Sequence, residues 1–409
     1  MNVEETFAAV RAREMDREFI QQDDLDVLVR ERRSALPWRG QFTPGLVSKL
    51  IDVYYPGSGM VFDPFLGSGT TVLESIRRGI PSAGAEINPA ALELAGILEI
   101  ASLPAQQRAS LIRQASAHFN GVTTWGEDTL FGALGATTDF AEHLLESHRA
   151  AANTDLARIF ATTLLLSMGD KKETDLKKVS KSWIQVRELI ADFPENPVPS
   201  RVIAADARSV PLENGCAGLI VTSPPYINVF NYHQNYRPAV ERIGWNVLPA
   251  ARTEIGSNRK NRQNRFLTVI QYCIDMADAI REMSRLIAAN GSIVIVVGRE
   301  SKVRGVPFSN SEIIASLAEG VAGMRFIRWQ ERKFVNRFGV TIFEDILSFQ
   351  ADESKDAAAD LDDFARGVAR HVLAEASMNL DGEVRDDMNL ALDSVTKVSA
   401  SPELTLLKV

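Results

Sequence analysis

Residues 61–71, VFDPFLGSGTT, constrain the fold of this chain more than any other stretch. An apolar run ends at Asp63 and breaks into a Gly-Ser-Gly turn, and a helical pattern begins at Thr71. At such a strand-to-helix turn, backbone N–H groups approach an anionic or polar ligand closely, because glycine has no Cβ in the way. We therefore predict a ligand site here, with Gly67 and Gly69 shaping the turn.

A second strand and a second helix follow directly. Residues 80–87 (IPSAGAEI) have the composition of a strand, and residues 88–103 have apolar residues at helical spacing. Two successive strand–helix units are typical of an α/β protein with a doubly wound parallel sheet. Glu86 ends the second strand, 23 residues after Asp63. In dinucleotide folds, a carboxylate at that position accepts the hydroxyls of a ribose.

The rest of the chain extends this pattern and interrupts it once. Four segments after residue 104 have helical period without a convincing strand, which predicts a helical insertion. Strands are predicted again at residues 201–206, 217–223 and 291–298, and an antiparallel strand pair at one edge of the sheet at 326–334 and 341–350.

These patterns divide the chain into five parts. They are an N-terminal helical extension, the cofactor half of an α/β domain, a helical insertion, the catalytic half of that domain and an acidic tail: residues 1–40, 41–103, 104–198, 199–350 and 351–409. Within the catalytic half, residues 228–265 are predicted to form a long polar loop. The tail is predicted to hold a helix or two together with disorder. It has a net charge of −7 out of −8 for the whole chain.

Composition narrows the class of protein. With 45% hydrophobic and 24% charged residues among 409, the chain has the make-up of an ordinary globular protein. No apolar run approaches the ~18–20 residues of a transmembrane helix, and the N-terminus lacks the apolar core of a signal peptide, so we expect a cytoplasmic protein. Cys216 and Cys273 form no CxxC, which argues against a disulfide framework and against a structural zinc. We assign no metal ligands.

Three cofactors compete for the glycine turn, and a purely structural turn is the alternative to all of them. A Walker loop for ATP needs a lysine where this chain has Thr70. The dinucleotide pattern G-x-G-x-x-G needs a third glycine where this chain has Val72. The third candidate is S-adenosyl-L-methionine, for which DPFLGSGTT is much more specific.

A second motif, TSPPY at residues 222–226, follows the apolar strand AGLIV. Together with DPFLGSGTT and GAEIN, it resembles the motifs of the amino-methyltransferases, which methylate the exocyclic amine of cytosine or adenine in DNA. The resemblance covers roughly residues 41–99 and 200–350. It implies a Rossmann-like methyltransferase fold, S-adenosyl-L-methionine as cofactor and DNA as partner. A cognate restriction endonuclease is a further candidate partner, as in restriction-modification systems.

The resemblance also assigns roles to single residues. The segment QFTPGLVSKLI before the first strand resembles the family's leading motif, which contacts the methionine end of the cofactor. Glu86 would hold the ribose and Asp206 the adenine amine. The remaining residues implied to bind the cofactor are Phe42, Thr43, Asp63, Phe65, Gly67, Gly69 and Thr70. The motif order differs from that of the family's permuted subgroup, and the long helical insertion departs from the family pattern.

The catalytic residues implied are Ser223, Pro224, Pro225 and Tyr226. The family motif begins with Ser in most cytosine-N4 enzymes and with Asp or Asn in most adenine-N6 enzymes. An exocyclic amine is a poor nucleophile, so its two N–H groups must be aimed by acceptors, here the Ser223 hydroxyl and the Pro224 carbonyl. Tyr226 would offer a ring on which a flipped base stacks. A rigid turn after a strand is the alternative, and ring-carbon methylation is disfavoured because neither cysteine follows a proline.

Basic residues follow this corner, after a stretch rich in aromatic residues. Within residues 252–265 they are Arg252, Arg259, Lys260, Arg262 and Arg265. Such residues beside a catalytic corner suit phosphate contacts, whereas a solvated surface loop is the plainer interpretation. The lysines of residues 171–181 are a weaker second candidate.

The leading hypothesis from the sequence is a site-specific DNA methyltransferase acting on cytosine N4, with the base flipped out of the duplex. Adenine N6 is the nearest alternative, followed by RNA methylation. A catalytically silent nucleic-acid-binding subunit is the alternative from another class, and the intact motifs weigh against it.

Overall fold

In a computed structural model of the chain, the described residues are 1–28, 34–127, 139–228, 232–257, 261, 263–336, 339–352, 354–378, 380–402 and 404. The side chains of residues 120–127 lie outside this description.

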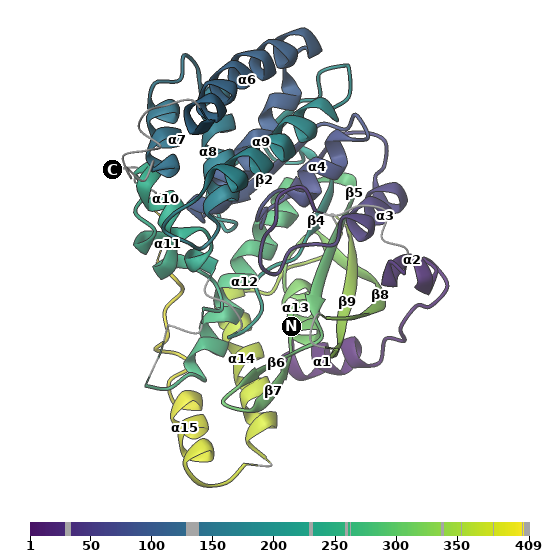
Figure 1. Cartoon of the computed structure of the whole chain (residues 1–409). Coiled ribbons are helices and arrows are strands. Elements are labelled where there is room, and N and C mark those ends of the chain that lie inside the picture. The colour runs from purple at the N-terminus through teal and green to yellow at the C-terminus, as the bar shows by residue number, and fades with distance from the viewer. Residues whose placement is uncertain are drawn as a thin grey trace.

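A seven-stranded sheet forms the centre of this part of the chain (Figure 1). Its strands follow the order β3-β2-β1-β4-β5-β9-β8. They are Met60–Asp63 (β1), Ser82–Glu86 (β2), Ser200–Ala204 (β3), Ala217–Thr222 (β4), Ile287–Gly298 (β5), Met324–Val335 (β8) and Thr341–Ala351 (β9). β1 to β5 pair in parallel, whereas β9 runs antiparallel to both of its neighbours. This confirms the predicted α/β fold, with the Rossmann-like parallel order and the antiparallel strands at one edge.

A short hairpin that the sequence pattern did not indicate follows β5. It consists of Glu300–Val303 (β6) and Val306–Ser309 (β7). Arg304 and Gly305 form its turn and both have positive φ, which matches the two-residue turns preferred by hairpins.

The helices lie on both faces of the sheet and beyond its β3 edge. Before the insertion they are Val3–Arg11 (α1), Gln22–Asp26 (α2), Pro44–Tyr54 (α3), Thr70–Ile76 (α4), Pro89–Ala95 (α5) and the 3-10 helix Gly96–Ser102 (η1). The insertion helices are Ala105–Glu127 (α6), Phe140–Arg149 (α7), Thr154–Met168 (α8) and Leu176–Ala191 (α9). The later ones are Tyr232–Gln234 (η2), Arg237–Ile243 (α10), Leu248–Thr253 (α11), Leu267–Leu286 (α12), Asn310–Glu319 (α13), Leu361–Ser377 (α14) and Gly382–Leu392 (α15).

The strands alternate their side chains between two cores, as the period of two demands. Phe62, Ile220 and Ile293 point to the face covered by α12, α13 and α14. Their neighbours Val61 and Leu219 point to the face covered by α3. A third core joins α4, α5 and η1 to the insertion helices, which gather at the top of Figure 1. The sheet is therefore buried on both faces, and the predicted helical insertion packs beyond its β3 edge.

The predicted long loop at residues 228–265 is corrected in its described part. It contains η2, α10 and α11, and Ala239 and Val240 are buried against the insertion helices. Each of the two α-helices begins with a proline in its first turn, Pro238 and Pro249. Proline is favoured there because its missing N–H would have no intrahelical partner. The overall polarity of the segment masked these short helices.

The acidic tail is part of the main core. Phe364, Val368 and Leu373 of α14 are buried against α12 and α13. A Cβ placed on Gly320, at the end of α13, would come within 2.4 Å of the Phe364 ring. The predicted helices of the tail are confirmed, with their charged residues on the outer face of an amphipathic α14. Among the described residues, none of the helices combines the length and apolarity needed to span a membrane.

Candidate active site

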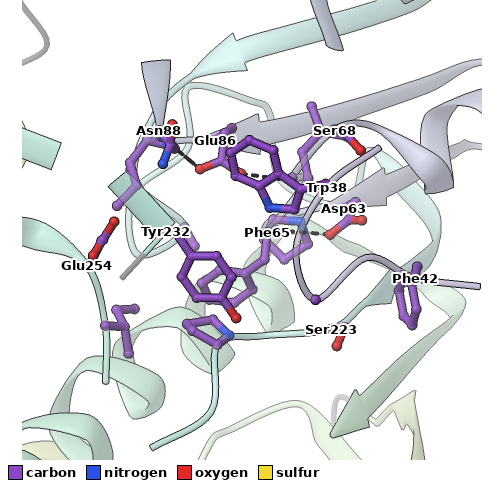
Figure 2. Close-up of a pocket in the computed structure, with 18 of the residues that line it drawn as sticks. Trp38, Phe42, Asp63, Phe65, Ser68, Glu86, Asn88, Ser223, Tyr232 and Glu254 are labelled. Carbon is purple, nitrogen blue, oxygen red and sulfur yellow. Dashed lines mark hydrogen bonds between the residues drawn. The ribbon is translucent and has the colours of Figure 1, made fainter. Parts of the chain in front are cut away.

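A pocket opens where the carboxyl ends of β1 to β4 meet (Figure 2), the edge at which doubly wound sheets bind ligands. The space between its walls, which is open to solvent, is about 930 Å³. Residues on and after the strand ends line it, namely Asp63 to Ser68, Thr70, Glu86 to Asn88, Ala205 to Ala207, Ser223 and Pro225. Residues from two other segments complete it: Trp38, Gly40 to Phe42, Tyr232 and Thr253 to Ile255.

Asp63 joins three elements at the floor of the pocket. Its Oδ1 accepts hydrogen bonds from the Thr222 hydroxyl at 2.6 Å and the Phe65 N–H at 3.0 Å, and its Oδ2 accepts one from the Thr71 hydroxyl at 2.7 Å. Burial raises the pKa of Asp63 to about 6, although these hydrogen bonds favour the charged form. The carboxyl group therefore connects the end of β1 to β4 and to α4.

Three backbone N–H groups hold Glu86, one from the glycine turn and two from the residues that follow β2. Gly67 donates to its Oε2 at 2.8 Å, and Ile87 and Asn88 each donate to its Oε1 at 2.8 Å. Burial raises the pKa of Glu86 to about 7 against the effect of these donors, and the nearby Asp63 adds to the rise. The carboxyl group is thus fixed at the end of β2 with its ionisation close to neutral pH.

The two glycines of the turn have different roles. Gly67 lines the pocket and gives its N–H to Glu86. Gly69 lies outside the pocket lining and begins α4 with a φ of 91°. A Cβ on Gly69 would come within 2.5 Å of Leu98, so this position is required for the packing of α4 on η1. Phe65 and Thr70 line the pocket, and their contact with a cofactor stays a prediction.

The segment before α3 lies along the pocket. Phe42 lines it, and its contact with a cofactor stays a prediction. Thr43 lies outside the lining and accepts a hydrogen bond from Arg332 at 3.1 Å. The sequence reasoning missed Trp38 and Gln41 in this segment. Gln41 donates to the hydroxyls of Ser68 at 3.2 Å and Thr70 at 3.1 Å, which ties the segment to the glycine turn.

The SPPY corner divides between the pocket and the core. Ser223 and Pro225 line the pocket, whereas Pro224 and Tyr226 lie outside the lining. The Tyr226 ring packs where a Cβ on Gly298 would come within 2.8 Å of it, and its hydroxyl donates to Glu344 at 3.3 Å and bonds with Ser223. Burial raises the pKa of Tyr226 well above its ordinary value. The stacking of a base on this ring stays a prediction.

Tyr232 of η2 and residues 253–255, at the end of α11 and just after it, close the pocket from the side opposite Asp63. Figure 2 shows the Tyr232 ring in the middle and Glu254 at the end near Asn88. The His233 backbone N–H and its Nδ1 contact the two Glu254 oxygens at 2.5 and 2.9 Å, and both residues are buried. His233 is thus a packing residue that fixes this segment. The aromatic content of the segment could have identified Tyr232 as a candidate, but it did not show that Tyr232 lies in the pocket.

Asp206 lies in the pocket lining, with its carboxylate bound to Arg208. Arg208 donates through its backbone N–H and Nε to Asp206 Oδ1, and through Nη2 to Oδ2 at 2.6 Å. Its role toward an adenine amine stays a proposal.

The predicted nucleic-acid contacts are only partly within the described residues. Arg259, Lys260 and Arg262 lie outside them. Arg252 and Arg265 are exposed, and Arg252 directly precedes the pocket residues Thr253 to Ile255. Among the described side chains, no group of histidines, cysteines or acidic residues has the arrangement of a metal site.

The polar groups of the pocket suit a nucleoside ligand with positive charge. Two carboxyl groups lie along it, the buried Asp63 and the half-buried Glu86, and aromatic rings flank them. Within the described part of the chain, the buried Asn88 Nδ2 has no hydrogen-bond partner, so a donor is available at the end near Glu254. The ribose hydroxyls, the amino group and the purine of S-adenosyl-L-methionine find matching partners in this set.

Comparison with known proteins finds a family model that is similar to part of the chain. Residues 24–96 match the family model described as DNA methylase, of the N6/N4 methyltransferases. This confirms, for that segment, the resemblance to DNA amino-methyltransferases. The match supports S-adenosyl-L-methionine as the cofactor.

Two type II methyltransferases are similar over short stretches. M.MjaII of Methanocaldococcus jannaschii is 38% identical over 53 residues, which are 13% of this chain and 10% of that protein. M.ScaI of Streptomyces caespitosus is 40% identical over 63 residues, 15% of this chain and 20% of that protein. The chain thus spans a fifth or less of the length of these relatives.

Solved structures with a similar outline include the rRNA methyltransferase aviRa from Streptomyces viridochromogenes, with 13% identity and a TM-score of 0.34 over 83% of this chain and 97% of that one. TrmN from Thermus thermophilus has 15% identity and a TM-score of 0.32 over 77% and 50%. Because both TM-scores are low, nothing about activity or substrate follows from these two likenesses.

Proposed function

We propose that this chain is a DNA methyltransferase that transfers a methyl group from S-adenosyl-L-methionine to the exocyclic N4 amine of cytosine. The observation that carries the proposal is the meeting of the SPPY corner with the glycine turn in one pocket. Ser223 and Pro225 line the same cavity as Asp63 and Glu86, although the helical insertion separates them along the chain. The match of residues 24–96 to the DNA methylase family supports the proposal.

The pocket is elongated, which suits a cofactor bound along the strand ends. Figure 2 shows Asn88 and Glu254 at one end, and Ser223, Asp63 and Phe42 at the other. Glu86 and Asn88 would hold the ribose and purine, and Asp63 with Phe42 the methionine end. When bound, S-adenosyl-L-methionine supplies an electrophilic methyl group on a sulfonium. The carboxyl groups of Asp63 and Glu86 in the pocket lining favour such a cation over a neutral ligand.

The chain's own contribution to the reaction is positioning. The amine of cytosine is weakly nucleophilic because its lone pair is delocalised into the ring. The Ser223 hydroxyl and the Pro224 carbonyl would accept its two N–H bonds and aim the lone pair. The Pro224–Pro225 pair fixes φ at both residues, so the carbonyl direction is set before the substrate arrives. The Ser223 hydroxyl donates its proton to the Tyr226 oxygen, whose own O–H donates to Glu344, so the Ser223 oxygen keeps its lone pairs for the amine.

Cytosine N4 is preferred over adenine N6 because the motif begins with Ser223. In the family that the motifs resemble, serine at this position is the more frequent choice of the cytosine enzymes. Adenine N6 is the second candidate, because the same two acceptors can receive the amine of either base.

A methylation assay with three proteins tests the proposal. The chain, a Ser223→Ala variant and a Ser354→Ala control are incubated with labelled S-adenosyl-L-methionine and unmethylated duplex DNA, and modified bases are mapped by sequencing. Ser354 is exposed and far along the chain from the pocket residues. We expect label on cytosine N4 from the chain and the control, and a rate lower by about 10²-fold in Ser223→Ala.

Label on adenine N6 would replace cytosine by adenine as the substrate. Label in RNA alone would exclude DNA as the substrate. No label in any nucleic acid with the unmodified chain would refute the proposed activity, and binding without transfer would favour a catalytically silent subunit. An undiminished rate in Ser223→Ala would remove the role given to that hydroxyl.

A further inference from the structure

The end of the described tail lies behind the cofactor pocket. After α15 the yellow segment of Figure 1 turns back along the molecule toward α12. Arg366 of α14 donates to the carbonyls of Val395 at 2.6 Å and Val398 at 2.8 Å, and Gln271 of α12 donates to that of Ser399 at 3.0 Å. These bonds guide residues 399–402 to a fixed place on the protein.

The tail residues there contact Arg208, whose side chain is 9% exposed. A guanidinium group has five N–H donors. Nε and one N–H of Nη2 go to Asp206, and one N–H of Nη1 goes to Asp275 at 2.8 Å. The remaining two go to the tail, to the carbonyls of Ser401 at 2.8 Å and Pro402 at 3.2 Å. The tail thus completes the hydrogen-bonding capacity of this buried cation.

The tail also binds the second carboxylate of this cluster. Asp275 on α12 is fully buried. The Ser401 N–H donates to its Oδ1 at 2.8 Å, and the Ser401 hydroxyl donates to its Oδ2 at 2.5 Å. Ser401 itself is 4% exposed. Residues of the tail, of α12 and of the pocket wall therefore share one buried network of charges and hydrogen bonds.

The outer member of the network is Asp206, which lines the pocket. The orientation of its carboxylate depends on Arg208, and the orientation of Arg208 depends on all five of its bonds. Without the two tail carbonyls, the guanidinium would turn toward water and Asp206 would lose a fixed direction, because a buried charge needs full pairing to stay in place.

We propose that residues 399–402 act as a clamp that positions Asp206, through Arg208, to accept the exocyclic amine of the cofactor's purine. The clamp rests on the proposed function, since it concerns the same cofactor site. It makes the acidic tail a determinant of cofactor recognition. Arg208 and Ser401 are positioning residues in this arrangement, and neither lines the pocket.

Two ligands that differ in one group test the clamp. S-adenosyl-L-homocysteine carries the purine amine, and S-inosyl-L-homocysteine carries a carbonyl in its place. Affinities are measured by isothermal titration calorimetry for the whole chain, for a chain that ends at Val398, and for a control that ends at Leu404. The control keeps Ser401 and Pro402.

We expect the whole chain and the control to prefer the adenosyl ligand. In the chain that ends at Val398, affinity for the adenosyl ligand should fall about tenfold, the loss expected when one hydrogen bond to a charged group is weakened. Affinity for the inosyl ligand should change less than about twofold, because it offers Asp206 no amine. Equal losses for both ligands, or no loss for the adenosyl ligand, would overturn the clamp.

Two point variants keep the test decisive if the shortened chain does not fold. Ser401→Pro removes the N–H and the hydroxyl that bind Asp275, whereas Ser401→Thr retains both. We expect the proline variant to reproduce the selective loss and the threonine variant to bind like the whole chain. A proline variant with full selectivity would overturn the clamp. If the whole chain binds neither ligand, the proposed function itself fails and the clamp with it.

Discussion

Asp63 and Glu86 show how single residues give this pocket its electrostatic character. Each is a carboxyl group at the end of a parallel strand, and each accepts hydrogen bonds from the turn that follows it and from a neighbouring segment, Thr222 for Asp63 and Gly67 for Glu86. Burial disfavours the charged form by more than these hydrogen bonds favour it, so the pKa of Asp63 rises to about 6 and that of Glu86 to about 7. A carboxyl group that titrates near neutral pH makes ligand binding depend on pH.

We predict that affinity for S-adenosyl-L-methionine rises with pH between about 6 and 8. The ribose hydroxyls donate best to ionised Glu86, so the protonated form below its pKa of about 7 must first lose its proton. The dependence should approach tenfold per pH unit well below that pKa. A Glu86→Gln variant, measured over the same range by calorimetry, corrects for titration of the ligand and should show a flatter profile. Identical profiles in the two proteins would argue against Glu86 as the ribose ligand.

The stability of the ligand-free protein depends on pH in the opposite direction. The folded state holds the Glu86 proton more tightly than the unfolded chain, whose pKa is near 4.5. Between that value and about 7, the folded state therefore binds more protons. The contribution of Glu86 to the free energy of unfolding falls as pH rises through this window.

Among the elements, α14 is a helix whose average composition does not reveal that it packs into the main core. The tail is acidic, but the acidic residues lie on one side of α14 while Phe364, Val368 and Leu373 pack into the main core. Net charge is an average over both faces of a helix, so it says little about the apolar stripe. The helices predicted for the tail are present, and their contribution to the core comes from that stripe.

We predict that Leu373→Ala lowers the free energy of unfolding by ~2–4 kcal/mol, because Leu373 is fully buried and its loss leaves a cavity. The matched control is Leu390→Ala on α15, where the side chain is 59% exposed and the change should stay within about 0.5 kcal/mol. Urea unfolding followed by circular dichroism measures both. Equal, small effects would show that α14 does not belong to the cooperative core.

For the whole molecule, the proposed function requires a surface beside the pocket that can contact DNA. Tyr232 and residues 253–255 form one wall of it, and Arg252 is exposed directly before that wall. Many of the other arginines near the sheet are engaged in ion pairs, such as Arg299 with Asp345 and Arg328 with Asp16. Exposed cations beside the mouth of a pocket are suited to phosphate contacts.

We predict that Arg252→Ala weakens DNA binding and lowers the slope of log affinity against log salt by about 0.9, the value for one lost phosphate contact. Arg370→Ala on α14, also exposed, is the control and should leave the slope unchanged. Fluorescence anisotropy with a duplex at several salt concentrations measures both. An unchanged slope in Arg252→Ala would place this residue outside the DNA interface.

Sequence patterns were sufficient to predict the parallel sheet, the glycine turn and the strand ends that hold Asp63, Glu86 and Ser223. These features are local: an apolar run, a change of period and a turn are encoded within about ten residues. The tertiary structure was needed to show that Trp38, Tyr232 and Glu254 line the same pocket. It was also needed to show that the Tyr226 hydroxyl donates to Glu344 and that the Ser401 carbonyl accepts from Arg208. Such meetings depend on how distant segments fill the space left by the sheet and its helices, and no short stretch of sequence contains that information.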